Sequence, residues 1–351
     1  MHKITNAILG ASVQFQMGRA KKNSHAQKDL MKNLKAFKFN RDNFIFNQIF
    51  EELNTSKLGE GYINGNFFPP TISEISRWSE IEFGTQFDLE LRWNMKIFYE
   101  YREAINDFVK TKNNVETLIL QERYQEALDI LSNFEEKYGV SLWLLENKIY
   151  LYSKLERGIE DEILSECQYD SAVKSVLLFY KLKNDPNLGS RDYDYIVKRE
   201  LQEFLRKCPE EKDTEEYFQY MIGAFSFEYS DTKIFTLLKN TYKMPLVDRY
   251  IVFIDICTYI ISSNSKYISV LKEHASNMVE IEDRVLQSVY FVISDKKNNN
   301  IKDDLLPIKD TLMEGNFPAC QEMLEIYIQK NPSNVEAICL YAKIIASMQI
   351  E

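Results

Sequence analysis

The distribution of proline limits the fold of this chain more than any other sequence feature. No proline occurs between Thr71 and Asp185, and the 351 residues contain only 8 prolines and 11 glycines. Strands need turn residues every few positions, so this interval predicts long helices joined by short loops. Apolar residues within it recur at helical spacing, as at Trp93, Ile97 and Tyr101. The sequence therefore predicts an all-α protein.

A stretch rich in glycine and proline divides the chain. It runs from Thr55 to Pro70 and contains three glycines and two consecutive prolines. The residues that follow, Thr71 to Glu74, have the form of a capping box, which opens a new helix. We predict an irregular, basic N-terminal helical region with its loop at residues 1–70, and a helical-repeat region at residues 71–351.

Helix-breaking residues recur along the second region. Beyond Asn113 they include Gly139, Gly158, Pro186 and Pro209, and they leave helices of about 12 to 18 residues between them. Paired helices of this size with short, spaced breaks are typical of an α-solenoid. We expect antiparallel helix pairs rather than a bundle.

Two stretches share a pattern of an aromatic residue followed three positions later by a small one. The first is Glu122-Arg-Tyr124-Gln-Glu-Ala127, followed by Leu131 and Phe134; the second is Gly315-Asn-Phe317-Pro-Ala-Cys320-Gln-Glu-Met-Leu324, closing at Asn331-Pro332. Both resemble the tetratricopeptide repeat family, although Cys320 stands where alanine is usual. The resemblance implies a right-handed, curved solenoid with a concave binding face, and it implies no chemistry. The alternative is a helical protein of another kind that matches by chance.

Charge is divided unevenly along the chain. Residues 1 to 41 carry nine basic groups and one acid, for a net charge of +8, so the remainder carries −18 of the total of −10. Within this segment leucine and phenylalanine recur opposite an exposed basic face, which is made of Lys28, Lys32, Lys35 and Lys38. We predict that this basic face contacts an acidic protein surface, nucleic acid or another copy of the chain. The alternative is a role in solubility alone.

Tyrosines beside charged residues are further candidate contacts. Tyr193, Tyr195, Tyr217 and Tyr220 are of this kind, and aromatic rings supply contact area at low entropic cost. We predict that they line a concave groove that binds a peptide.

The C-terminal stretch is apolar nearly all round. Residues 335–350 contain only four polar side chains, whereas a repeat array that ends in water closes with a helix whose outer face is polar. We therefore expect Ile338 and Ile345 to be covered by another subunit, a second copy or further chain. The alternative is that this helix folds back onto its own array.

No set of residues with catalytic or metal-binding spacing is legible. The three histidines are scattered, and no two cysteines have zinc-site spacing. Arg19 and His25 have the Arg-x5-His form of a class of helical ribonucleases, which leaves a ribonuclease as a minor alternative. Asp255, within an apolar run, must reach solvent or find a partner such as Arg249. We expect no enzyme activity, no cofactor and no metal.

Composition and patterning favour a cytoplasmic protein. The longest apolar stretch, Tyr250 to Ile261, is too short to span a bilayer and contains Asp255, and the odd number of cysteines is typical of reduced thiols. Abundant Lys, Asn, Ile and Tyr indicate a bacterial source. The function we expect is that of a scaffold or adaptor subunit of a multi-protein complex that binds a partner protein or peptide. The alternative is a nucleic-acid-associated regulator that contacts phosphates through residues 1–41.

Overall fold

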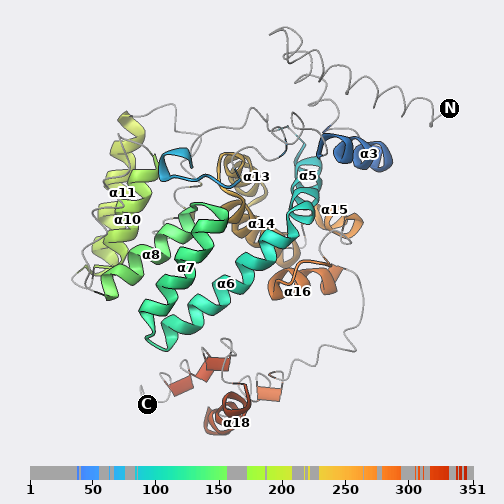
Figure 1. The fold of residues 1–351 in the computed structure, drawn as a ribbon. Helices are drawn as coiled ribbons and strands as arrows, with labels where there is room; N and C mark the ends of the chain where they lie inside the picture. The colour runs from blue at the N-terminus through green and yellow to red at the C-terminus, as the bar shows by residue number, and fades with distance from the viewer. Residues whose placement is uncertain are drawn as a thin grey trace, which may run out of the picture.

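The computed structural model describes residues 41–54, 67–75, 84, 86–155, 172–185, 188–207, 229–263, 265–274, 279–293 and 317–331. It also describes Lys38, Ile63, Tyr217, Tyr220, Met221 and several single positions between Leu305 and Ile345. Every regular element within these residues is helical, and none of them forms a strand (Figure 1). The prediction of an all-α protein is confirmed for this part of the chain.

The described elements run from Asn43 to Lys330. In chain order they are α3 (Asn43–Asn54), the 3-10 turn η1 (Ile72–Glu74), α5 (Phe87–Glu100), α6 (Arg102–Leu120), α7 (Tyr124–Tyr138), α8 (Leu142–Lys154), α10 (Ala172–Lys183), α11 (Ser190–Lys207), α13 (Asp231–Asn240), the 3-10 turn η3 (Thr241–Lys243), α14 (Leu246–Ser262), α15 (Ile268–Glu273), α16 (Arg284–Ile293) and α18 (Phe317–Lys330). None of the helices in the described ranges is long and apolar enough to cross a membrane.

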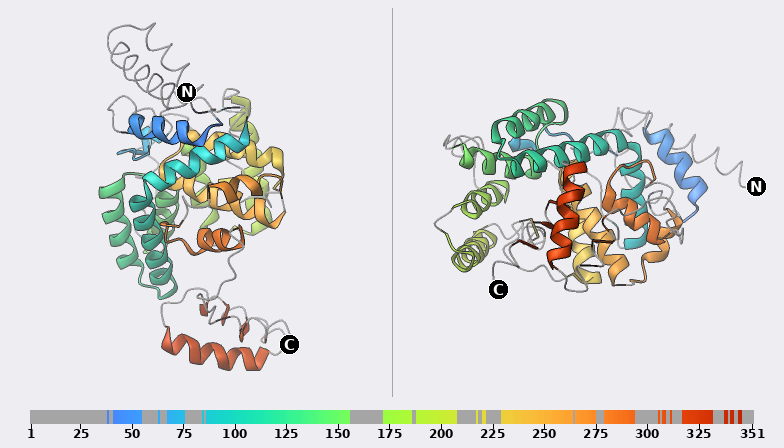
Figure 2. Two further views of the ribbon diagram at one scale, coloured as in Figure 1. Left: turned by 90° about the vertical axis from the view of Figure 1, so that its right-hand side faces the viewer. Right: turned by 90° about the horizontal axis from the view of Figure 1, so that it is seen from below.

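The helices form two groups that meet at α14. In the first group, α6, α7, α8, α10 and α11, each helix packs on the next described helix (Figure 1). In the second group α14 contacts α13, α15 and α16, and α15 also contacts α5. Because α14 contacts α6 and α8 as well, it lies between the two groups, as the views in Figure 2 also show.

The turn between α6 and α7 explains the first repeat-like motif. Glu122 has a φ of 58°, and the backbone N–H groups of Glu122 and Arg123 donate to the carbonyl groups of Ile119 and Leu118 at 3.0 and 2.9 Å. This is the Schellman arrangement, whose left-handed position is usually glycine. Ala127, one turn into α7, is fully buried, as expected of a small residue where two helices approach closely.

The chain on the two sides of the predicted boundary at residue 70 shares one core. Phe46 and Phe50 of α3 pack edge-on against Trp93 of α5 at 6.1 and 5.2 Å between ring centroids. All three belong to a continuous cluster of buried apolar residues that extends to α16. Where the structure describes them, residues before 70 therefore do not form a core of their own.

Residues 67–70 are held within the body by backbone hydrogen bonds. The carbonyl group of Phe67 accepts from the N–H of Leu246 at 3.0 Å, and that of Pro69 accepts from Val140 at 2.8 Å. Gly139 has a φ of +70°, and a Cβ there would lie 2.3 Å from the Pro69 carbonyl oxygen. Glycine is thus required both by the backbone conformation and by the close approach of this segment.

The C-terminal part has a small core of its own. Leu305, Ile308, Cys320, Leu324, Ala337 and Ile344 form this second cluster. In Figure 1 α18 lies apart from the other helices. Ile338 and Ile345 are half-buried, so neighbouring parts of the same chain cover some of this apolar stretch. The predicted covering of the remainder by another molecule stays a prediction.

Candidate functional site

The prediction of an exposed basic face is wrong for Lys38, the one of its four lysines that the structure describes. Lys28, Lys32 and Lys35 lie outside the described residues, whereas Lys38 is fully buried instead of exposed. Its ammonium group lies 2.7 Å from a carboxylate oxygen of Glu90 and over the rings of Trp93 and Tyr242. The charge is tolerated in the interior because the carboxylate compensates it and two aromatic faces surround it.

Glu90 is the centre of a buried hydrogen-bond network. Its Oε1 accepts from the backbone N–H of Gly84 at 2.6 Å, and its Oε2 accepts from the hydroxyl of Tyr242. Lys38 donates to the same hydroxyl at 2.9 Å. These contacts join residue 38, α5 and η3, so the network holds the fold together rather than facing a ligand.

Arg249 belongs to the same interior and does not pair with Asp255, which corrects that prediction. It donates from Nη2 to Oδ1 of Asn94 at 2.9 Å, and its guanidinium lies over the rings of Phe67 and Tyr242. Burial lowers the pKa of Arg249 to about 10. Six residues correspond to about one and two-thirds helical turns, so Arg249 and Asp255 point to different sides of α14.

Asp248 caps a neighbouring helix from the interior. Its two carboxylate oxygens accept from the backbone N–H groups of Leu142 and Trp143 at 2.8 and 3.0 Å, at the start of α8. Burial raises the pKa of Asp248 to about 7, although these two hydrogen bonds act in the opposite direction. The carboxylate thus accepts from backbone N–H groups that have no partner within the first turn of α8.

A partly exposed cluster of one carboxylate and three tyrosines is the candidate site. Oδ2 of Asp255 accepts from the hydroxyl of Tyr220 at 2.6 Å and lies 3.5 Å from that of Tyr229. The rings of Tyr229 and Tyr259 stack with 5.6 Å between centroids and 20° between planes. All four side chains are half-buried. We refer to them as the Asp255 site.

The Asp255 site lies on a side of α14 that approaches solvent. Most residues of this helix are buried, but Ile251, Asp255, Thr258, Tyr259 and Ser262 are half-buried or exposed. Their spacing of 4, 7, 8 and 11 residues from Ile251 is that of one helical face. A rigid, central helix therefore presents both the carboxylate and one ring of the tyrosine stack.

Burial of Tyr220 and Tyr229 raises the pKa of their hydroxyl groups. The pKa of Tyr229 is raised to about 12 by burial and by the neighbouring Asp255 carboxylate. The same two causes raise the pKa of Tyr220. Both hydroxyls are therefore protonated near neutral pH and serve as hydrogen-bond donors to Asp255.

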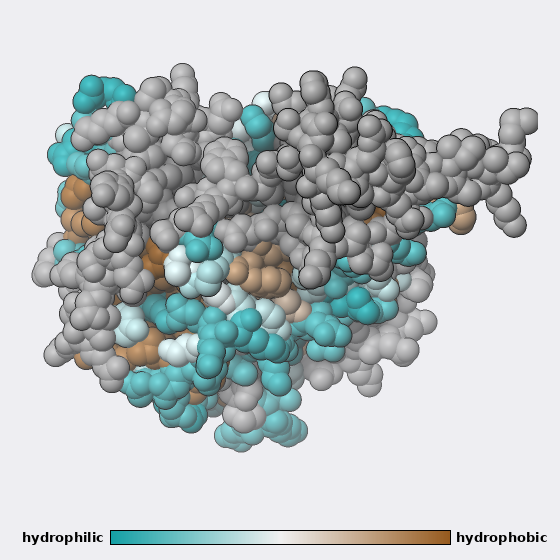
Figure 3. Space-filling view, turned by 45° about the horizontal axis from the view of Figure 1, so that its top comes forward, coloured by the Kyte–Doolittle hydropathy of each residue, from teal (hydrophilic) through white to brown (hydrophobic). Residues whose placement is uncertain are grey.

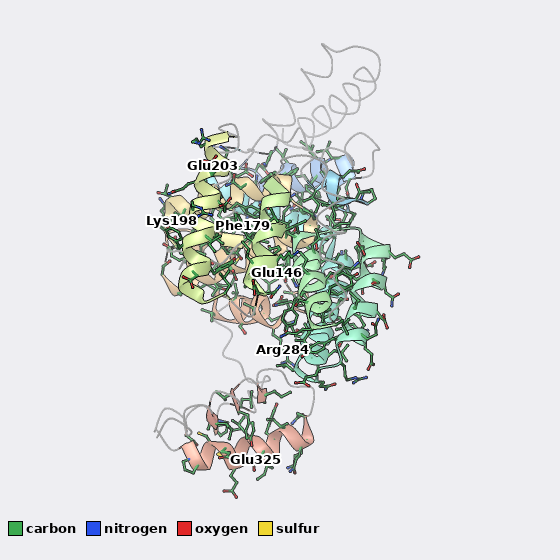
Figure 4. The ribbon with its side chains drawn as sticks, turned by 90° about the vertical axis from the view of Figure 1, so that its left-hand side faces the viewer. Glu146, Phe179, Lys198, Glu203, Arg284 and Glu325 are labelled. Atoms are coloured by element: carbon green, nitrogen blue, oxygen red, sulfur yellow. The ribbon has the colours of Figure 1, made fainter. Side chains whose placement is uncertain are left out.

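The four predicted groove tyrosines are not gathered in one groove. Tyr193 and Tyr217 are core residues, buried at 8% and 0% exposure, while Tyr195 on α11 is 68% exposed. The pKa of Tyr180 on α10 is raised well above its usual value by burial, with smaller contributions that include Tyr217 and Tyr193, so these rings are interior neighbours. Only Tyr220 belongs to the candidate site. Figure 4 shows α10 and α11 from the outside, with Phe179 and Lys198 labelled.

Sequence reasoning did not identify Tyr229 and Tyr259. The available signal was the spacing of four residues between Asp255 and Tyr259, which places them on the same face of a helix. Tyr229 precedes α13 and reaches the site only through the packing of α13 on α14.

Among the described residues no three His, Cys, Asp or Glu side chains are grouped so that they would hold a metal ion. Comparison with protein-family models, with curated proteins and with solved structures found no match to this chain.

Proposed function

We propose that this chain is a non-catalytic scaffold or adaptor subunit that binds a partner protein or peptide in the cytoplasm. The observation that carries the proposal is the Asp255 site, a half-exposed carboxylate with stacked tyrosine rings on a helix whose other sides are fixed in the core. Tyrosine is enriched at protein interfaces because it offers a large, rigid contact surface with a polar end.

The arrangement of the helices supports a binding role. From α6 to α11 each helix packs on the next described helix, an arrangement that agrees with a tetratricopeptide-like array of helix pairs. Such arrays present extended surfaces for partners. The α6–α7 hairpin, with its left-handed turn and buried Ala127, is the element most similar to a repeat unit.

Exposed apolar side chains provide additional contact surface. Tyr195 on α11 is 68% exposed, and Val292 on α16 is 58% exposed. In the view of Figure 3 apolar residues reach the surface in patches among polar ones. Exposed apolar patches bordered by polar residues are typical of interaction surfaces.

The test is reconstitution of a defined complex. Tagged protein is cross-linked in the cells that naturally make it, the attached proteins are identified, and the leading candidate is purified separately. Mixing the two purified proteins should give a complex of fixed stoichiometry in size-exclusion chromatography with light scattering. Absence of such a complex, or enzymatic turnover that one substitution abolishes, contradicts the proposal. Binding to nucleic acid alone, with steep salt dependence, supports the regulator instead.

A further inference from the structure

We propose that the Asp255 site takes the guanidinium group of an arginine side chain. This inference rests on the proposed function, because the arginine belongs to the bound protein or peptide. Three features support it: a carboxylate oxygen to which no described residue donates, an aromatic ring stack beside that carboxylate, and the net negative charge of the chain after residue 41.

No described residue donates to one of the two oxygens of the Asp255 carboxylate. Oδ2 is occupied by the hydroxyls of Tyr220 and Tyr229, whereas Oδ1 accepts no hydrogen bond from any described residue. No described cation forms an ion pair with Asp255 either, since Arg249 is directed to Asn94. A half-buried carboxylate of this kind gains most from a charged donor, because hydrogen bonds between ionised groups are stronger than those to neutral donors.

The tyrosine stack favours a planar cation. Tyr229 and Tyr259 lie nearly parallel, with 20° between their rings, so each ring has one face covered by the other. Tyr259 is half-buried on the solvent side of α14, and we place the guanidinium on the ring face that Tyr229 does not cover. Guanidinium groups stack on such faces and are weakly hydrated, whereas the compact lysine ammonium holds its water more strongly.

The position of Tyr259 relative to Asp255 and the net charge of the chain after residue 41 both favour a basic ligand. Tyr259 lies one helical turn after Asp255, so a single guanidinium stacked on the ring is within reach of the carboxylate. Residues after position 41 carry a net charge of −18, which attracts a cationic peptide. Ile251 and Ile261 are half-buried on the same helix and offer apolar contact to residues that flank the arginine.

The experiment uses three capped tripeptides, Gly-Arg-Gly, Gly-Lys-Gly and Gly-Gln-Gly, added to the full chain with ¹³C-labelled tyrosine rings. The arginine peptide should shift the ring signals of Tyr229 and Tyr259 in a saturable way. The lysine peptide should bind more weakly, and the glutamine peptide should give no saturable shift. Signals are assigned by single Tyr→Phe substitutions.

Two variants and one control test the residues. Asp255→Asn should weaken binding of the arginine peptide about tenfold or more, as expected for one charge-assisted contact, and it keeps an acceptor for Tyr220. Tyr259→Leu should also weaken it, because the aromatic face is lost. Asp192→Asn removes the same charge from an exposed position on α11 and should leave binding unchanged.

Several outcomes overturn the inference. Equal shifts with the arginine and glutamine peptides, no saturable shift, or an equal loss in Asp192→Asn and Asp255→Asn would each do so. The proposed function is tested separately, because a reconstituted complex that forms equally well with Asp255→Asn leaves the scaffold role intact and removes only the arginine site.

Discussion

The ammonium group of Lys38 lies 2.7 Å from the carboxylate of Glu90, and both side chains are fully buried. The pair joins the end of the basic N-terminal segment to α5, and the hydroxyl of Tyr242 bridges the two charges. A buried charge without its partner is strongly unfavourable, so this pair makes the fold depend on residue 38.

Replacing Lys38 alone should destabilise the protein substantially. We expect Lys38→Met to lower the free energy of unfolding by about 3–5 kcal/mol, because Glu90 is left with an unpaired buried charge. The double variant Lys38→Met/Glu90→Gln should recover a large part of this loss. Urea denaturation of the two single variants and the double variant measures the coupling. Simple addition of the two single effects would show that the pair does not act as a unit.

Replacing Asp248 should change how stability depends on pH. Its pKa is about 7 in the folded protein against an ordinary value of 3.8, so the folded state holds the proton more tightly than the unfolded state. The contribution of Asp248 to stability is therefore complete below about pH 4, falls as pH rises to about 7, and is constant above that. As pH rises through this window, the free energy of unfolding of Asp248→Asn should increase relative to that of the wild type by up to about 1.4 kcal/mol per pH unit.

Urea denaturation at pH 5, 6, 7 and 8 tests this dependence. The variant Asp192→Asn, whose carboxylate is exposed on α11, serves as the control and should follow the wild type. If the free energies of unfolding of Asp248→Asn and the wild type differ by the same amount at all four pH values, Asp248 does not titrate in this range.

Glycine at position 122 should stabilise the protein. Glu122 adopts the left-handed conformation at a φ of 58°, which costs a non-glycine residue roughly 1–2 kcal/mol, while glycine loses some entropy on folding. We expect Glu122→Gly to raise the unfolding free energy by about 0.5–1 kcal/mol, measured by thermal and urea denaturation. A loss of stability would mean that the Glu122 side chain makes a contribution beyond the backbone.

Alanine at position 139 should have the opposite effect. The added Cβ would lie 2.3 Å from the carbonyl oxygen of Pro69, in a backbone at φ +70°. We expect Gly139→Ala to cost at least about 2 kcal/mol of unfolding free energy. Gly189→Ala is the matched control, because its Cβ would meet only Asp192 at an ordinary 3.5 Å. Equal effects of the two substitutions would contradict the packing of residues 67–70 against this turn.

The helical content could be predicted because it follows from local rules. The helical spacing of Trp93, Ile97 and Phe108 is found in α5 and α6, and Ala127 lies buried in α7 as its motif implies. The break between α5 and α6 at Tyr101 could not be predicted, because no glycine or proline marks it. Apolar residues of both helices belong to the shared core, and Tyr101 packs against it.

Burial of polar residues was the main source of error. Periodicity indicates which side of a helix a residue occupies, but it does not reveal what another segment brings to that side. Lys38 is buried because Glu90 and two aromatic rings lie opposite it, and Tyr217 is buried within the core cluster. The partners of Asp255 are likewise tyrosines from segments before α13, which the sequence of α14 alone does not indicate.

The most direct test of the account is amide hydrogen exchange of the chain with and without its reconstituted partner. The account predicts that binding slows exchange in two sets of peptides: those that cover Ile251 to Ser262, and those that contain Tyr220 or Tyr229 of the Asp255 site. Protection confined to other segments, with these two unchanged, would contradict the claim that this face of α14 is where the protein binds its partner.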